Sequence, residues 1–331
     1  MLYRDIVKNN NVPFDEISIP SKGIFYKDKK ETFLVKYVTA KEENLLTSPT
    51  LIDSGKALEM LMSSCLLDWD GDIDRLLIGD RDAFMVYLRS TSYGDKIPYD
   101  FICSNCKIEN KASFNLSELE MKDVDKLDRP DENLEYTFTL SKMKINNEDV
   151  VVKFRPKTLG DERSILKIIE EESKSVGGIK IDNRIEATYR TQISSINGIN
   201  NEIFIKKIIK GMSLSDSSEL RGYMKKVEPG VQNELVTECE SCGHSVKNKI
   251  PIDGNFFGLD VEYRQHMMNE IFLITYYGKG GFSRDDVFNM PVYERRWVMQ
   301  RIQEEVEKKN AADRQASNKA RSDARSRAPS R

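Results

Sequence analysis

Two pairs of cysteines in the spacing Cys-x-x-Cys are the residues of this chain that could do chemistry. Cys103 and Cys106 form the first pair, Cys239 and Cys242 form the second, and together they use four of the five cysteines. Each pair lies between two short runs with the composition of β-strands: residues 98–102 and 111–114, and residues 234–237 and 244–247. A strand, a turn with two thiolates and a returning strand make a zinc knuckle.

Two knuckles supply the four sulfurs of one tetrahedral site. The spacing therefore predicts one structural zinc ion per chain, bound by Cys103, Cys106, Cys239 and Cys242. Iron also binds to four thiolates and is the second choice. His244 lies beside the second pair and is an alternative ligand, although with four cysteines present we expect it to be a polar strand residue.

Other interpretations of the cysteines fit less well. A redox Cys-x-x-Cys usually opens a helix, because the helix N-terminus lowers the thiol pKa, and no helical pattern follows either pair. A disulfide framework is typical of short secreted chains, whereas this chain has 331 residues and begins without the apolar core of a signal peptide. Gly243 after the second pair suits a left-handed turn, and Lys107 is a mildly strained substitute in the first.

Further motifs that resemble functional sites fail on their spacing. The run 68–74 resembles a calcium loop, but its glycine is misplaced and Gly79 stands where a bidentate Glu is needed, so we interpret it as a helix-capping turn. Gly177-Gly178 lacks the Lys-Ser/Thr of a phosphate loop. With two histidines in the chain, no catalytic constellation can be assembled, so we expect no enzyme and no small-molecule substrate.

Composition points to a protein with an ordinary core and surface. Hydrophobic residues make up 39% of the chain, which is enough for a core, and the net charge of −3 does not suggest a nucleic-acid binder. No apolar run approaches the roughly 18 residues that span a bilayer, and unpaired thiols indicate a reducing cytosol. The end of the chain, 308–331, is rich in Lys and Arg, and we expect it to be disordered from about Arg321.

The hydrophobic pattern predicts an α+β fold. A helix is clear from Gly55, with Cys65 on its buried face, and another opens at Asp80 and ends at Gly94, directly before the first knuckle. The stretch between the knuckles holds two strands, a turn and several helices: 136–140, 150–154, Asn146-Asn147, a helix from about Leu159, one with Ile185, Tyr189 and Ile193, one around 204–209, and one that Ser213 and Asp216 cap.

The chain is predicted to be a split zinc ribbon with additions. The main domain spans residues 1–262 and contains an insertion at about 117–231. A C-terminal helical unit follows at 263–303, with helices that end at Gly278, begin at Ser283 with Asp286 in a capping box, and begin at Pro291. Residues 304–331 are the end of the last helix and the disordered basic tail.

A weak internal sequence repeat precedes the two knuckles. The helix before each knuckle begins at a Ser or Asp and holds an Arg and a Tyr: Asp80, Arg89 and Tyr93 in the first half, and Ser215, Arg221 and Tyr223 in the second. The repeat is too weak to establish a duplication. We expect instead that each helix supports one half of the metal site.

These motifs together resemble one family. They are Ile19-Pro20-Ser21-Lys22-Gly23, Ile78-Gly79-Asp80-Arg81-Asp82-Ala83, Tyr87-Leu88-Arg89, Tyr93-Gly94, Leu214-x-Asp216, Leu220-Arg221-x-Tyr223, Glu228-Pro229-Gly230-Val231, both cysteine pairs, Phe256-Phe257, 282–287 and Arg295-Arg296-Trp297. The chain resembles the T4-type baseplate hub and hub-assembly proteins of contractile-tailed phages over most of residues 15–303. Lys107 and the basic tail depart from that pattern.

The resemblance implies a non-enzymatic structural or chaperone-like protein of the tail baseplate hub that acts through protein–protein contacts. Its partners would be other hub and tail proteins, in the host cytoplasm during assembly and then in the virion baseplate. The alternative is a zinc-ribbon protein that binds nucleic acid through its basic tail, and such binding would weaken steeply with salt.

Overall fold

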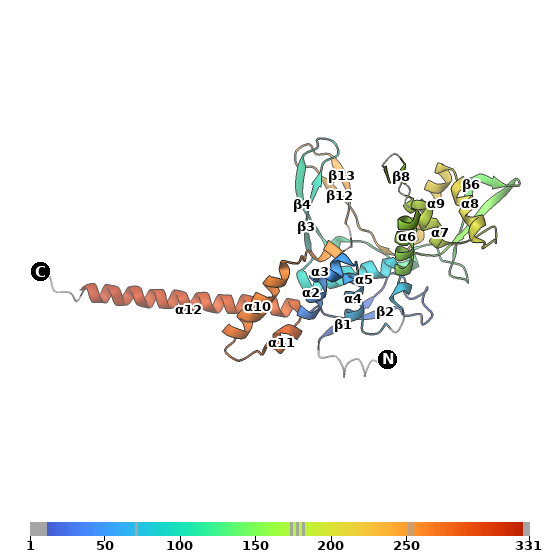
Figure 1. Ribbon diagram of the computed structural model, residues 1–331. Coiled ribbons are helices and arrows are strands. Elements are labelled where there is room, and N and C mark those ends of the chain that lie inside the picture. Colours follow the sequence, from blue (N-terminus) through green and yellow to red (C-terminus); the bar gives the residue numbers. More distant parts are fainter. Residues whose placement is uncertain are drawn as a thin grey trace.

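The computed structural model of the chain describes residues 12–69, 72–172, 175–176, 179–180, 183–250, 252 and 254–326. Helices and small antiparallel sheets share these residues, so the expected mixed α and β character is confirmed. Figure 1 shows a central body from which two hairpins, an insertion and one long helix extend in different directions. Among the described helices, none combines the length and the apolar composition that a membrane crossing requires.

The central body combines a two-stranded sheet with four helices. Its elements are β1 (Phe14–Ser18), β2 (Thr32–Lys36), α2 (Ala40–Leu46), α3 (Pro49–Asp53), α4 (Ala57–Cys65), the 3₁₀ turn η1 (Ile73–Arg75) and α5 (Ile78–Tyr93). Thr39 and Glu42 form a capping box at the start of α2. Cys65 is fully buried in the core of this body, as its position on the apolar face predicted.

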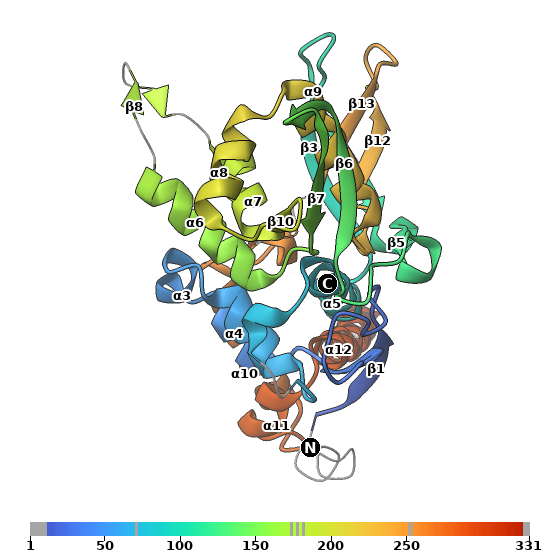
Figure 2. The same cartoon turned by 90° about the vertical axis from the view of Figure 1, so that its right-hand side faces the viewer.

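Both predicted hairpins are present. β3 (Lys96–Ile102) pairs with β4 (Glu109–Asn115), and β12 (Glu234–Glu238) pairs with β13 (Ser245–Lys249), each antiparallel. The hairpins stand side by side and project from the body in both views (Figures 1 and 2). After the second hairpin, Phe256 and Phe257 of η4 (Gly254–Phe257) return to the body and join its core. The bases of both hairpins therefore contact one core.

The stretch between the hairpins has a core of its own. Strands β6 (Tyr136–Ile145), β7 (Glu148–Phe154) and β10 (Ile193–Ile196) form a sheet in the order β10-β7-β6. The remaining elements are η2 (Leu116–Glu118), β5 (Met121–Lys122), η3 (Val124–Lys126), α6 (Leu159–Glu172), β8 (Ser175–Val176), β9 (Ile179–Lys180), α7 (Arg184–Gln192), α8 (Glu202–Gly211), α9 (Leu214–Val227) and β11 (Gly230–Val231). Asn146 and Asn147 both have positive φ, which confirms the predicted turn between β6 and β7.

Two predicted element boundaries in this part of the chain and the body are wrong. Ile193 was expected on a helix with Tyr189, but α7 ends before it and Ile193 begins β10, because its backbone pairs with Phe154 of β7. Asp80 was expected to open a helix, whereas α5 begins at Ile78 and Asp80 lies fully buried in its first turn. Gly177-Gly178 lies outside the described residues.

Asp80 fastens the N-terminal loop to α5. Its carboxylate accepts hydrogen bonds from the backbone N–H of Ser21 at 2.9 Å, from the Ser21 hydroxyl at 2.6 Å and from the Tyr26 hydroxyl at 2.5 Å. Burial raises the pKa of Asp80 to about 6, against the hydrogen bonds from Ser21 and Tyr26 that lower it. All three of these donors to the carboxylate are neutral groups.

The first half of the chain crosses the second half at two glycines. A Cβ atom on Gly79 of α5 would lie 1.9 Å from the carbonyl oxygen of Pro229 and 2.7 Å from the Cα of Gly230. No side chain fits there, so glycine at position 79 lets α5 contact β11 directly. This crossing brings together two of the motifs quoted above.

The C-terminal part contains α10 (Tyr263–Tyr277), α11 (Arg284–Asn289) and α12 (Val292–Ser326). Gly278 caps α10, and Ser283 and Asp286 form a capping box on α11, as predicted. The prediction of disorder from Arg321 is wrong as far as Ser326, because α12 continues to that residue. Arg321, Ala324 and Arg325 in this segment are strong helix formers even without a core to pack on. Figure 2 looks along α12, which Figure 1 shows extending away from the body.

A buried ion pair joins these C-terminal helices to the body. Arg295 of α12 and Glu43 of α2 are both fully buried and form a 2.5 Å contact between Nη2 and Oε2. Arg295 also bonds to Glu270 of α10 at 2.9 Å, while the hydroxyls of Tyr93 and Tyr263 donate to Glu43. We call this set of residues the Glu43–Arg295 clamp.

Candidate metal centre

The two hairpins bring all four paired cysteines to one point. Their sulfur atoms lie within 4.8 Å of one another, with 3.7 Å between Cys103 and Cys242 and 3.6 Å between Cys106 and Cys239. Cys103 and Cys239 are buried, Cys106 is partly buried and Cys242 is exposed. Residues more than a hundred positions apart in the sequence therefore form one cluster of thiols.

The two turns have matching backbone geometry. In the first, the N–H of Lys107 donates to the carbonyl of Cys103 at 3.0 Å; in the second, the N–H of Gly243 donates to the carbonyl of Cys239 at 2.8 Å. Lys107 has φ +62° and Gly243 has φ +67°. The left-handed turn predicted from Gly243 is thus present in both hairpins, and Lys107 adopts it at a cost that glycine avoids.

Backbone N–H groups surround the sulfurs in the same way in both turns. The N–H groups of Cys106 and Asn105 hydrogen-bond to Cys103 and lower its pKa. Burial alone would raise the pKa of Cys239, but the N–H groups of Ser241 and Cys242 bring it to about 6. The N–H of Ile108 favours ionised Cys106, yet burial and the neighbouring thiols raise its pKa to about 12. The N–H donors favour thiolates in both turns, whereas the neighbouring thiols lower the pKa of Cys103 and Cys239 and raise that of Cys106.

Polar contacts hold the hairpins together beyond the sulfurs. The Tyr99 hydroxyl bonds to the Thr237 hydroxyl, and buried Asn110 accepts a 3.1 Å bond from the N–H of Glu240. His244 makes a 3.1 Å contact from Nε2 to the Ser104 hydroxyl, and its ring is not part of the four-residue cluster. Asn105 donates to the sulfur of Cys242 at 3.7 Å. Sequence analysis missed Asn110, Tyr99 and Thr237, since no spacing rule distinguishes them.

The cluster fits a tetrahedral metal ion. Zinc–sulfur bonds of about 2.3 Å in a tetrahedron place the sulfurs roughly 3.8 Å apart, close to the two shortest separations found here. Four sulfur ligands, oriented N–H donors and a hairpin at each side suit zinc, and the same donors suit iron. The turns that hold the cysteines lead into strands β4 and β13 rather than into helices.

The residues expected to support the cysteines make other contacts. Arg89 donates to the carbonyl of Gly94 and lies over the ring of Tyr93, whose hydroxyl bonds to Glu43. Tyr223 packs against Phe138 and Phe154 in the core of the insertion. The expectation that these helices support the sulfurs is therefore wrong for these side chains, because Arg89 bonds to Gly94, Tyr93 bonds to Glu43, and Tyr223 packs inside the insertion.

The calcium-like run serves as structure, as expected. Asp72 caps η1 by accepting a hydrogen bond from the N–H of Asp74, and Asp68 accepts one from Leu34 and pairs with Lys30. Residues 70 and 71 lie outside the described part of the chain. The acidic side chains described here bond to the protein itself.

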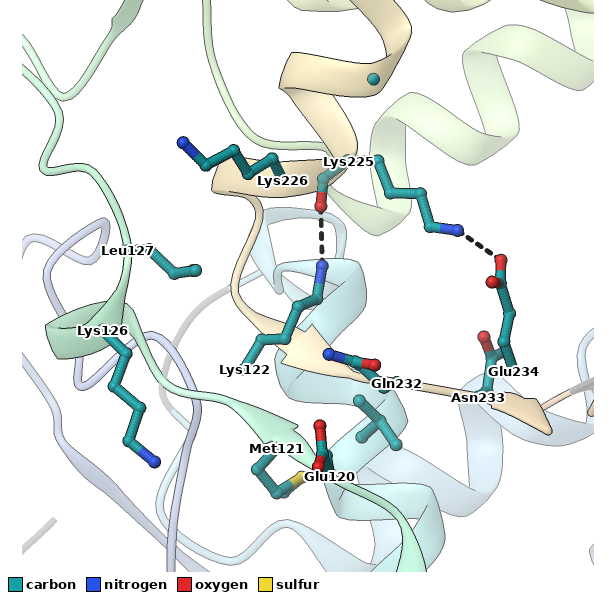
Figure 3. A pocket seen from close by; sticks show the side chains of 12 residues that line it. Glu120, Met121, Lys122, Lys126, Leu127, Lys225, Lys226, Gln232, Asn233 and Glu234 are labelled. Atoms are coloured by element: carbon teal, nitrogen blue, oxygen red, sulfur yellow. Dashed lines mark hydrogen bonds and ion pairs between the residues drawn. The ribbon is translucent and has the colours of Figure 1, made fainter. Parts of the chain in front are cut away.

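A lysine-lined pocket lies where β5 and β11 meet the end of α9. Its cavity measures about 720 Å³, and Figure 3 shows that the lysine ammonium groups point in different directions. Lys122 donates to the carbonyl of Lys225, Lys225 pairs with Glu234, and Lys226 lies 3.4 Å from Asp128. Because these groups diverge and already have partners, the pocket does not form a convergent anion site.

Comparison with known proteins gives one match. The model of a family described as T4 bacteriophage base plate protein matches residues 24–258, which is most of the chain and includes both hairpins, the insertion and the body without β1. No curated protein and no solved structure matches the chain.

Proposed function

The chain belongs to the T4 bacteriophage base plate protein family, and on this premise we propose that it is a non-enzymatic structural or assembly protein of the baseplate hub. It acts through contacts with other tail proteins of a contractile-tailed phage. The family match over residues 24–258 carries this proposal. We propose that the protein acts in the host cytoplasm during assembly and at the baseplate of the virion, and that neither a membrane nor a small-molecule substrate is its partner.

The four-cysteine cluster gives this function a rigid arm. We propose that Cys103, Cys106, Cys239 and Cys242 hold one zinc ion per chain, with the two hairpins as a split zinc ribbon. The sulfur separations and the N–H groups around the thiols support this assignment. Bound zinc would supply four bonds that fix the hairpins to each other. The hairpins themselves then present a fixed surface to a neighbouring protein.

The proposed division of the chain follows from its cores. Residues 1–262 form the main domain, with an insertion at about 117–231, and 263–303 form the C-terminal helical unit. The insertion buries a cluster of its own around Phe154 and Leu220, and the C-terminal helices bury one around Ile271. Residues 304–326 continue the last helix beyond that core.

Co-purification from infected cells tests the function. A tagged copy of the chain is recovered from cells during infection, and mass spectrometry identifies the proteins bound to it and the proteins of finished particles. We expect defined baseplate or tail proteins in the first sample, and the chain itself in the second if it stays in the virion. Recovery with DNA at physiological salt, without tail proteins, would favour the nucleic-acid alternative and overturn the proposal.

Elemental analysis tests the metal separately. Protein purified without chelator should contain one zinc per chain, and a Cys65→Ala variant should contain the same amount because Cys65 lies in the body core. Undenatured wild-type protein with no bound metal would rule the site out, while the baseplate role would stand on the family match.

A further inference from the structure

The C-terminal helices expose an apolar stripe. Met268, Phe272 and Tyr276 follow one another at intervals of four along α10, so they share one face of the helix. Their exposed fractions are 40%, 62% and 66%, and the rings of Phe272 and Tyr276 stack at 5.6 Å. The opposite face of α10 holds the buried Met267, Ile271 and Ile274. The α10 stripe is therefore a second apolar face on a helix that needs only one to pack on the body.

A groove with arginines on its rim adjoins this stripe. The cavity measures about 520 Å³ between α10 and α11, within the range of binding pockets, and Met268 belongs both to it and to the stripe. Phe288 lines the groove beside Met268, and Arg284 lies over the Phe288 ring. Arg264 lines the same groove, one helical turn before Met268, and is exposed. Apolar surface and positive charge thus meet at one end of the stripe.

The charges around the stripe define what can cover it. Arg264 and Arg284 lie at one end, where Asp285 is 3.9 Å from Arg284, and Lys279 follows Gly278 at the other end. A second copy packed antiparallel across Phe272 would bring Arg264 opposite Lys279, which repels. Nucleic acid fits poorly, because the middle of the stripe offers aromatic rings and the cations that could bind phosphates lie only at its two ends. An amphipathic helix with carboxylates beside its apolar face matches both the stripe and its charged ends.

We propose that the α10 stripe and the adjoining groove dock an amphipathic, acidic helix of another baseplate protein. Its apolar side chains cover Phe272 and Tyr276 and enter the groove beside Met268, and its carboxylates bond to Arg264 and Arg284. The stretch from Arg264 to Tyr276 is about 18 Å long, which corresponds to roughly three turns of the partner helix. This inference rests on the proposed function, since it takes the partner from the same assembly.

Site-specific crosslinking in infected cells tests the surface. The photoreactive residue p-benzoylphenylalanine is placed at position 276, and as a matched control at position 214, where Leu214 of α9 is 91% exposed. We expect position 276 to give an adduct whose crosslinked peptide is an acidic, amphipathic helix of another virion protein, and position 214 not to give it. An adduct to a second copy of this chain, to nucleic acid, or to the same peptide from both positions would overturn the proposal, as would no adduct.

Charge reversal then tests the arginine contacts. Arg264→Glu in the position-276 background should reduce the adduct at least tenfold, while Arg264→Lys should retain most of it. Melting curves of both purified variants establish that they fold, since Arg264 is exposed and outside the core. Equal amounts of adduct from both variants would contradict the proposal that the partner helix is acidic. Co-purification from the same cells tests the two proposals separately. If the chain is recovered with tail proteins but forms no adduct, the docking surface is contradicted; if it is recovered with no tail protein, the proposed function itself is contradicted.

Discussion

The four-cysteine cluster and the Glu43–Arg295 clamp both join distant parts of the chain, by opposite means. Cys103 and Cys242 are 139 positions apart, and Arg295 and Glu43 are 252 positions apart. The cysteines meet at the projecting turns of two hairpins, where Cys242 is exposed to solvent. Glu43 and Arg295 meet inside packed helices, where both are fully buried.

The difference lies in what each join depends on. The hairpins have little shared core, so the cluster needs a ligand or the few polar bonds around Tyr99 and Asn110 to keep them together. The helices around the clamp also pack through the hydrophobic cluster around Ile271. We therefore expect the charges of the clamp mainly to determine how α2, α10 and α12 are arranged relative to one another. A buried ion pair is costly to break from one side, because the partner left behind is an uncompensated charge.

Metal removal should have the largest effect, and it should be local. Structural zinc contributes about 10–16 kcal/mol of apparent binding free energy in zinc-finger peptides at neutral pH. Cys103→Ser or Cys239→Ser should therefore release the hairpins from each other, with fast amide hydrogen exchange in β3, β4, β12 and β13 and little change in α5. Cys65→Ala serves as the control that keeps the metal. Unchanged exchange in the hairpins of both serine variants would show that the pairs do not share an ion.

Breaking the clamp should cost less but act on the whole protein. Arg295→Met leaves the Glu43 carboxylate buried beside Tyr93 and Tyr263 without its cation, and we expect a loss of about 3–5 kcal/mol in the free energy of unfolding. Adding Glu43→Gln removes the charge and keeps an acceptor for the tyrosines, so the double variant should recover much of that loss. Additive effects in urea unfolding would mean that the two side chains are not coupled.

Asp80 and Glu43 are both buried carboxylates, but Asp80 accepts hydrogen bonds from neutral donors, whereas Glu43 is paired with Arg295. The pKa of Asp80 is raised to about 6 in the folded protein, from an ordinary value of 3.8. Between these values the folded state keeps a proton that the unfolded state has lost, so stability is highest below the lower value and falls as pH rises through the higher one. The shift corresponds to about 3 kcal/mol.

Asp80→Asn should remove this part of the pH dependence. Urea unfolding of both proteins at several values from pH 4 to 7 measures it: the difference in free energy between wild type and variant should change by about 2 kcal/mol over that interval, in the direction of a less stable wild type at higher pH. A difference that stays constant with pH would show that Asp80 ionises normally despite its burial.

The smallest effect should come from the one mismatch between the two hairpins. Lys107 holds the left-handed conformation that Gly243 holds in the second turn. Lys107→Gly should therefore stabilise the first hairpin by at most about 1 kcal/mol, since relief of the strain is offset by the entropy of a freer unfolded chain. Gly243→Lys should destabilise the second by a similar amount. Metal affinity measured by chelator competition would detect both, and equal affinities would show that the turns are insensitive to this position.

The grouping of the four cysteines could be predicted from the sequence because cysteine spacing is a local signal. Cys103 and Cys106 lie in one turn and Cys239 and Cys242 in another, so the pattern is complete before any tertiary structure is known. The hairpins, the caps at Ser213 and Ser283 and the buried position of Cys65 follow from equally local rules.

What the sequence did not show depends on contacts between distant segments. Glu43 and Arg295 look like ordinary surface residues of amphipathic helices, and their pairing appears only once α2 and α12 are packed. Ile193 has helical spacing from Tyr189, yet pairing with Phe154 makes it a strand residue. Arg89 and Tyr93 precede the first knuckle, but Arg89 bonds to Gly94 and Tyr93 bonds to Glu43. The direction of a side chain on its helix, rather than its proximity in sequence, decides what it reaches.

The length of α12 changes what a small movement at its base means. From Arg295 to Ser326 the helix runs for about 47 Å, and a tilt of about 5° at the clamp would move its tip by about 4 Å. α12 is thus a lever arm that pivots on a buried ion pair between three helices. A force at the tip exerts a torque on Glu43 and Arg295, and a small shift of these side chains produces a larger displacement of the tip.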